Sequence, residues 1–153
     1  MTKFLLSVHV LAAIIAIGPV TVAGSMFPAA TRRALAADGA DRDIAVLRSL
    51  HRICRVYAGV GVMVPVFGLA TASALGVLGD AWLITSIVLT TAAAGVLALL
   101  VLPRQQQILD AVPDAAAVGR WPARLAMHTG VFNILWAVVT VLMIVRPGST
   151  TGA

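Results

Sequence analysis

Four long stretches of this sequence contain no charged residue. They lie between Lys3 and Arg32, between Arg55 and Asp80, between Asp80 and Arg104, and between Arg124 and Arg146. A helix crosses the hydrocarbon core of a bilayer with about 20 mostly apolar residues, and each stretch is long enough for that. A helix on the surface of a soluble protein would interrupt such a stretch with a polar face. The sequence therefore predicts a chain that lies mostly within a membrane.

The predicted spans use nearly the whole chain, which has 153 residues, of which 60% are hydrophobic. Backbone polar groups inside lipid must bond to one another, so the spans are expected to be helices. The alternation of apolar and polar residues that a membrane barrel needs is absent. We predict an all-α transmembrane four-helix bundle, one membrane domain over residues 1–153. Its spans lie at about 4–27, 53–78, 82–102 and 125–145.

Basic residues separate by connection. Nine of the eleven Lys and Arg residues lie in or beside the first and third connections, and the other two are Lys3 and Arg146. The positive-inside rule then places both connections in the cytoplasm and both termini outside (N-out/C-out). We expect the arginines to meet anionic headgroups of the bilayer. No nucleic-acid-binding motif accompanies the net charge of +5, so nucleic acid is not an expected partner.

The connections also carry local signals. Asp38-Gly39 predicts a break, after which Asp41 or Asp43 opens an amphipathic helical stretch that runs into the second span. The short turn at Leu78-Gly79-Asp80 predicts a hairpin of the second and third spans, with Asp80 capping the third helix. Pro113-Asp114 is a further helix-start signal. Trp82 and Trp121 are expected at opposite membrane faces, as interfacial aromatic residues.

Small residues recur at helical spacing in all four spans. In lipid, helices associate through close backbone approach and interhelical hydrogen bonds rather than through apolar burial. We therefore predict that these residues mark the inward sides and act in packing. They are Ala13, Ala16 and Val20 in the first span, Gly61, Gly68, Ala72 and Gly76 in the second, Ser86, Thr90, Ala94 and Ala98 in the third, and Ala126, Gly130, Asn133, Ala137 and Thr140 in the fourth. Thr90, Asn133 and Thr140 are expected to make polar contacts between helices.

Two prolines, Pro19 and Pro65, lie inside the first and second spans. A proline within a helix removes one backbone hydrogen bond and crowds the preceding turn. We predict that both prolines kink their helices and are candidate hinges.

Acid–base chemistry has little support in this sequence. The chain has no Glu, and no Asp, Lys or Arg lies deep in a predicted span, so the intramembrane carboxylates typical of ion pumps are missing. No nucleophile with a base and an orienting partner stands at a recognisable spacing. The single cysteine, Cys54, has no partner for a disulfide or a metal pair and is interpreted as a small residue at a helix start. The chain is therefore predicted not to be an enzyme.

Three histidines are the candidate cofactor-binding residues. His9 lies about two helical turns inside the first span, whereas His51 and His128 lie near the predicted cytoplasmic surface. Two histidines at one depth on facing helices can supply both axial ligands of a haem, and only His51 and His128 meet that condition. The structural interpretation is that His51 and His128 lie near the headgroups, His51 facing them, while His9 hydrogen-bonds to a hydroxyl or a backbone carbonyl.

The opening segment from His9 to Pro19, HVLAAIIAIGP, carries a resemblance. It resembles the first span of an uncharacterised family of small bacterial four-span integral membrane proteins, chiefly through His9 and Gly18. The resemblance covers most of the chain and implies a multi-pass protein of the bacterial inner membrane. The same opening is similar to copper-resistance membrane proteins and b-type membrane cytochromes, which implies haem b or copper as a cofactor. Those proteins have a fuller set of intramembrane histidines than this chain.

Three functional hypotheses follow. The first is a non-enzymatic accessory or assembly subunit that acts through helix contacts with a membrane-protein partner or a second copy. The second is a haem- or copper-binding membrane protein that uses its histidines. The third is a small transporter that moves a neutral solute by bending at Pro19 and Pro65.

Overall fold

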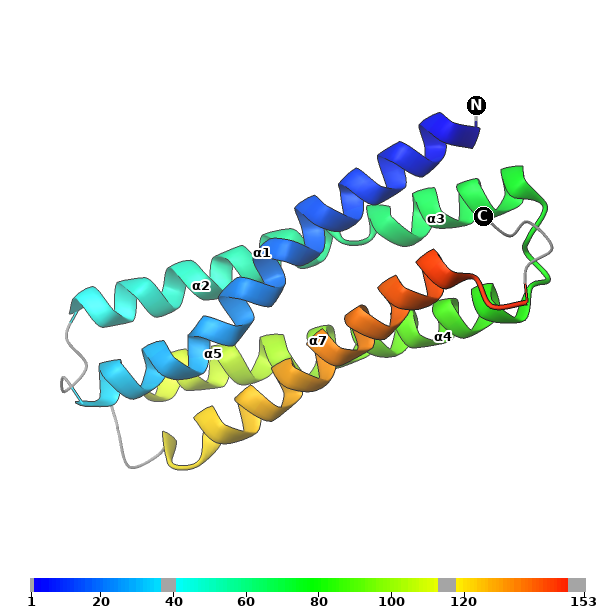
Figure 1. Cartoon of the computed structure of the whole chain (residues 1–153). Helices are drawn as coiled ribbons and strands as arrows, with labels where there is room; N and C mark the ends of the chain where they lie inside the picture. The colour runs from blue at the N-terminus through cyan, green and yellow to red at the C-terminus, as the bar shows by residue number, and fades with distance from the viewer. Residues whose placement is uncertain (1, 37–40, 113–117, 149–153) are drawn as a thin grey trace.

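The computed structural model describes residues 2–36, 41–112 and 118–148 (Figure 1). Within these ranges the chain is helical and has no strand. The helices are α1 (Thr2–Ala36), α2 (Asp41–Val60), α3 (Met63–Leu75), α4 (Ala81–Gly95), the π-helix η1 (Val96–Val101), α5 (Leu102–Ala111) and α7 (Trp121–Val145). The predicted break at Asp38-Gly39 and the start signal at Pro113-Asp114 lie outside the described residues.

Four helical runs are long and apolar enough to cross a membrane. They are Lys3–Ala36, Asp41–Leu75, Ala81–Ala111 and Trp121–Val145, and each contains an 18-residue window with a mean hydropathy of 1.8 or more. The predicted all-α four-helix bundle is therefore confirmed. The amphipathic stretch before the second span is the first part of α2, which begins at Asp41 as predicted.

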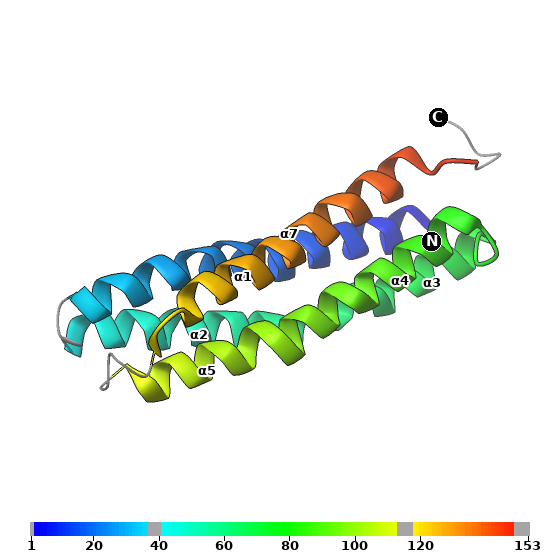
Figure 2. The same ribbon diagram turned by 90° about the horizontal axis from the view of Figure 1, so that it is seen from below.

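The two ends of the bundle differ (Figure 2). One end, which we call the arginine-rich end, holds the end of α1, the beginning of α2, the end of α5 and the beginning of α7. The other, the hairpin end, holds the beginning of α1, the α3–α4 hairpin and the end of α7. The orientation of these ends across a membrane stays a prediction.

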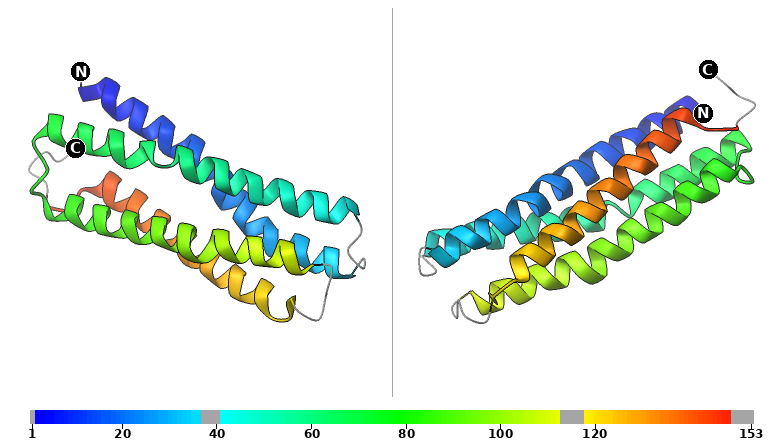
Figure 3. Two further views of the ribbon diagram at one scale, coloured as in Figure 1. Left: turned by 180° about the vertical axis from the view of Figure 1, so that it is seen from behind. Right: turned by 60° about the horizontal axis from the view of Figure 1, so that its bottom comes forward.

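The helices form two antiparallel pairs that share one core. α1 packs against α2 and α3, while α4 and η1 pack against α7, and the pairs meet through α1 with α7 and α2 with α5. In Figure 3 the pairs diverge toward the hairpin end. The large buried cluster includes Phe27, Leu47, Ile108 and Leu125, all from the arginine-rich half. At the hairpin end a small cluster is built on Ala72, Trp82 and Leu83. The hairpin end is thus the less filled half.

The second span is interrupted between α2 and α3, at Gly61 and Val62. Pro65 has no N–H to donate to the Gly61 carbonyl, as a regular helix would require. That carbonyl instead accepts the N–H of Val64 at 3.1 Å in a tighter turn. A kink was predicted at Pro65, and the structure instead shows an interruption of the helix about one turn before it. Helix α1, in contrast, runs unbroken through Pro19 and Pro28.

A wide helical turn accommodates another proline, Pro103, which we did not predict to lie within a helix. Pro103 lies within the third helical run, past the predicted end of the third span. A proline ring clashes with the carbonyl four residues earlier, here that of Leu99. Leu99 lies in the π-helix η1, where the N–H of Leu102 bonds to the carbonyl of Leu97, five residues back. The wider turn lets α4 continue into α5.

Arg–Trp pairs mark both ends of the bundle. The guanidinium of Arg146 lies 5.6 Å from the ring centroid of Trp82 at the hairpin end, and that of Arg104 lies 5.7 Å from Trp121 at the arginine-rich end. Trp82 also donates its indole N–H to Asp80 at 2.9 Å. Asp80 does stand at the N-cap position of α4, but its side chain makes no cap hydrogen bond, contrary to our prediction. Its carboxylate orients the tryptophan instead.

Candidate functional site

A cavity of about 1010 Å³ lies between the two helix pairs at the hairpin end. Its walls come from α1 and α3 on one side and α4 and α7 on the other, and most lining side chains are apolar. Several of them, such as Ile14 at 64% and Val145 at 64%, are also exposed at the protein surface. The cavity is therefore an open groove that lipid can reach, rather than a sealed void.

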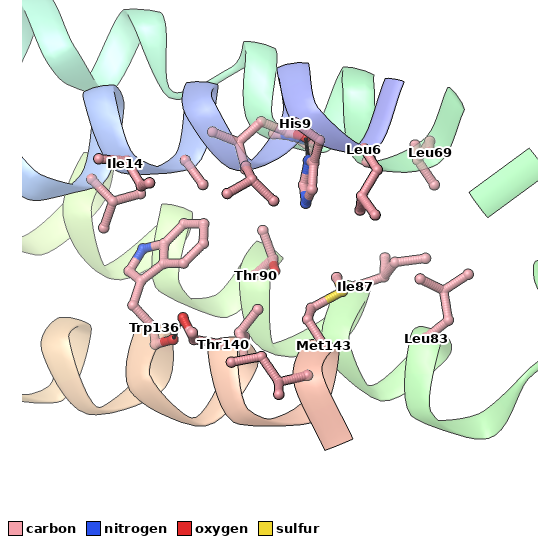
Figure 4. A pocket seen from close by; sticks show the side chains of 18 of the residues that line it. Leu6, His9, Ile14, Leu69, Leu83, Ile87, Thr90, Trp136, Thr140 and Met143 are labelled. Atoms are coloured by element: carbon pink, nitrogen blue, oxygen red, sulfur yellow. Dashed lines mark hydrogen bonds between the residues drawn. The ribbon is translucent and has the colours of Figure 1, made fainter. Parts of the chain in front are cut away.

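His9 is fixed on the α1 wall of this cavity. Its Nδ1 lies 2.9 Å from the carbonyl oxygen of Val64 on α3, so the partner is a backbone carbonyl, as predicted for this histidine. Gly68 provides the space for the ring, because a Cβ there would lie 2.9 Å from His9 Cε1. Figure 4 shows the ring projecting across the cavity toward α4 and α7. The sequence did not pair His9 with Gly68, because nothing in a span shows which helix it faces.

We expect Gly68→Ala to destabilise the protein by displacing the His9 ring and breaking its bond to Val64. Interhelical hydrogen bonds in membrane proteins contribute about 0.6–1.7 kcal/mol, which sets the size of the loss. Thermal unfolding in mild detergent, followed by circular dichroism, measures it. Gly130→Ala is the control, since a Cβ at Gly130 meets nothing within 4 Å.

The same pair supports a sharper comparison. In a His9→Leu background, with the ring removed, Gly68→Ala should lose most of its effect. Fully additive losses in the double variant would contradict the contact between the two residues.

The cavity has few other polar groups. The indole N–H of Trp136 is buried and has no hydrogen-bond partner among the described residues, and Trp136 lines the cavity from α7. Thr140 donates its hydroxyl at 2.8 Å to the carbonyl of Trp136 in its own helix, so it does not bond between helices as predicted. Thr90 lines the cavity from α4, with its side chain near the middle of Figure 4. His9 and Thr90 are thus the groups left to bind a polar atom of a guest molecule, because the indole nitrogen of Trp136 is buried beneath the cavity surface.

Arg146 supplies the charge at the mouth of the cavity. It also lines the cavity, and its Nε donates to the carbonyl of Met143 at 3.3 Å. Because its guanidinium also lies over Trp82, Arg146 is held at the rim. Among the described lining residues it is the one charged side chain, and no carboxylate accompanies it.

We compared the chain with protein-family models, curated proteins and solved structures. None of the three comparisons finds a match. The functional argument therefore depends on the geometry of this chain alone.

A second buried polar cluster lies in the arginine-rich half. His51 Nδ1 lies 3.0 Å from Gln105 Oε1, and Gln105 Nε2 lies 3.5 Å from Cys54 Sγ. Gln105 and Cys54 are fully buried and His51 is 7% exposed. The interpretation of His51 as a headgroup-facing residue was therefore wrong: it joins α2 to α5. The sequence missed Gln105 because it is one of three consecutive glutamines beyond the predicted third span.

The histidines do not form a common site. His9 bonds to α3 at the hairpin end and His51 to α5 in the other half, while Nδ1 of His128 is buried without a partner among the described residues. Within the described ranges, no three His, Cys, Asp or Glu side chains are grouped closely enough to hold a metal ion. One nitrogen of His51 is occupied by Gln105, so the structure gives no specific support to His51 and His128 as paired haem ligands.

The predicted packing residues divide into two groups. Gly68 and Ala72 lie at helix contacts, and Asn133 donates to Ser25 of α1 at 3.1 Å. Gly61 lies instead at the helix interruption, Gly76 ends α3 with a positive φ of 71°, and Gly130 meets no neighbour. Apart from Pro122, the buried residues of α7 are Leu125, Thr129, Phe132 and Val139, and each lies one residue before a member of the predicted small-residue stripe. Large side chains and Thr129, rather than small residues, therefore pack α7 against the rest of the bundle.

Proposed function

We propose that this chain is a non-enzymatic, multi-pass protein of the bacterial inner membrane that binds an amphipathic molecule in the hairpin-end cavity. One observation carries the proposal: an open, largely apolar cavity of about 1010 Å³ with a fixed imidazole on its wall. Small-molecule sites in proteins are typically concave and mostly apolar, with a few placed polar groups that orient the ligand. The exposed lining residues give a guest a lateral route from the lipid.

The accessory-subunit hypothesis has the same cavity as its support. A helix of a partner protein would cover the apolar walls of α3 and α4 in place of a small molecule. The haem or copper hypothesis has His9 as its supporting residue, and the transporter hypothesis has the interruption at Gly61 and Val62. We rank them below ligand binding because the cavity combines volume, access and an oriented imidazole at one place.

Fluorescence of Trp136 tests the proposal directly. The chain has three tryptophans, and Trp82→Phe with Trp121→Phe leaves Trp136 as the one reporter. A brominated fatty alcohol, added to this protein in mild detergent, should quench Trp136 in a saturable manner at about one molecule per chain. Bromine quenches only on close approach, so saturation reports occupancy of the cavity.

A matched pair of variants separates the cavity from the micelle. Ala13→Phe fills space on the α1 wall and should abolish saturable quenching, whereas Ala92→Phe, on the exposed side of α4, should leave it intact. Quenching that rises linearly with quencher and is the same in both variants would overturn the proposal. Copurification of a second protein that protects Trp136 from quenching by the brominated alcohol would favour the accessory-subunit hypothesis.

The proposed orientation has its own test. With nine of eleven basic residues at the first and third connections, we expect a reporter inserted after Ala36 to be cytoplasmic and one fused to the C-terminus to be external. Alkaline phosphatase is active outside and green fluorescent protein inside, so the two sites should give opposite signals. Equal signals from both sites would contradict the N-out/C-out topology.

A further inference from the structure

We infer that the guest in the hairpin-end cavity presents a hydroxyl group, which donates a hydrogen bond to Nε2 of His9. This inference rests on the proposed function and names the chemical class of its ligand: a lipid-soluble alcohol or phenol with a long apolar body. The argument begins with the position of one proton.

The bond to Val64 fixes the tautomer of His9. A backbone carbonyl can only accept, so the ring nitrogen 2.9 Å from the Val64 oxygen must carry the hydrogen. A neutral imidazole has one N–H, and Nε2 then carries a lone pair. His9 therefore presents an acceptor to the cavity.

That acceptor has no partner among the described residues. Thr91 and Thr140 line the cavity too, but their hydroxyls donate to carbonyls of their own helices at 2.9 and 2.8 Å. Thr90 lines it from α4 and makes no hydrogen bond to His9. In a hydrocarbon environment an unpaired polar atom is costly, because no bulk water replaces the missing bond. A guest that brings its own donor gains that bond, and a guest without one leaves Nε2 unpaired.

The apolar body of the guest has a defined direction. From His9 the cavity continues along Ile14 and Ile17 to the ring of Trp136, whose indole nitrogen is itself buried. Figure 4 shows His9 and Trp136 projecting into the cavity from opposite walls. The lining along this path is apolar, so the body of the guest that lies there is apolar as well. An alcohol or phenol with a long apolar body therefore fits both the imidazole and this lining.

A pair of probes that differ in one methyl group tests the inference. We would titrate the single-tryptophan protein with a brominated fatty alcohol and with its methyl ether of the same chain length. The alcohol should bind about 3- to 15-fold more tightly than the ether, which is the range expected for one hydrogen bond inside a membrane protein. In His9→Leu the two probes should bind alike, with the affinity lost by the alcohol rather than gained by the ether.

The outcomes separate this inference from the function beneath it. Saturable binding of both probes with equal affinity in the wild-type cavity would overturn the hydroxyl assignment and leave the proposed function standing. No saturable binding of either probe would overturn both. The wild-type comparison decides the matter even where His9→Leu does not fold.

Nitrogen NMR adds a second measurement, because the chemical shift of Nε2 would not respond to the ligand if His9 had a purely structural role. In ¹⁵N-histidine-labelled protein, the Nε2 resonance of His9, assigned by its loss in His9→Leu, should shift on addition of the alcohol and not of the ether. A Soret band that forms with added haemin and depends on His9 would instead assign Nε2 to iron and overturn the inference.

Discussion

Gly24→Leu is expected to cause one of the two largest losses of stability in this chain, about 1–3 kcal/mol, the usual cost of overpacking a filled interface. Gly24 is buried where α1 crosses α7, and a Cβ there would lie 3.2 Å from Thr129 Cγ2. The neighbouring Ser25 accepts the hydrogen bond from Asn133. A larger side chain must push the helices apart and break that bond too.

Thermal unfolding in mild detergent measures the loss, and Gly59→Leu is the control. Gly59 is exposed in α2 and has nothing within 4 Å of a Cβ, so a leucine there extends into lipid. Similar unfolding temperatures for Gly24→Leu and the wild type would show that the packing of α1 against α7 does not depend on the contact between Gly24 and Thr129.

Gln105→Leu is the second expected large effect. It leaves Nδ1 of His51 buried without its 3.0 Å partner, and an unsatisfied buried group costs about 1–3 kcal/mol. Gln107→Leu, two residues further along and exposed, is the matched control and should change little.

The double variant His51→Leu with Gln105→Leu should recover much of the lost stability. Replacing both partners of a buried hydrogen bond by apolar groups is often nearly neutral, whereas removing one partner is not. A double-mutant cycle in denaturant would therefore give a favourable coupling between the two sites. Additive losses would mean that the bond between α2 and α5 contributes nothing of its own.

The sequence specified the helices much better than their faces. Uncharged length alone predicts four helical runs, because lipid leaves few other solutions for the backbone. The same apolarity removes the polar side that would show which residues face inward. The stripe predicted on the fourth span was therefore one residue away from the buried side of Leu125, Thr129 and Phe132.

The candidate site was predictable in part. A histidine within an apolar helix needs a partner, so a backbone carbonyl or hydroxyl for His9 follows from the sequence. The identity of that partner, Val64, depends on how α1 crosses α3, which no local pattern encodes. The cavity was not predictable either, since it arises from the divergence of two helix pairs.

The π-helix η1 keeps one side of the third helical run buried although its buried residues are spaced every four residues. Ala93, Leu97, Val101 and Gln105 stand at strict four-residue steps, and all are buried. In a regular helix of 3.6 residues per turn, each such step rotates by about 40°, so three steps would carry Gln105 about 120° off that side. The wide turn absorbs this rotation and keeps Gln105 in phase with His51.

Deleting one residue from η1 would let it close into regular α-helix. The lost residue removes about 100° of rotation and the closed turn restores about 120°, so α5 would keep nearly its present phase relative to α4. Loss of Leu99, whose side chain is 74% exposed, would therefore leave Gln105 facing His51. The wide turn thus holds one residue more than a regular helix would need, and a segment shorter by one residue could keep the same face buried.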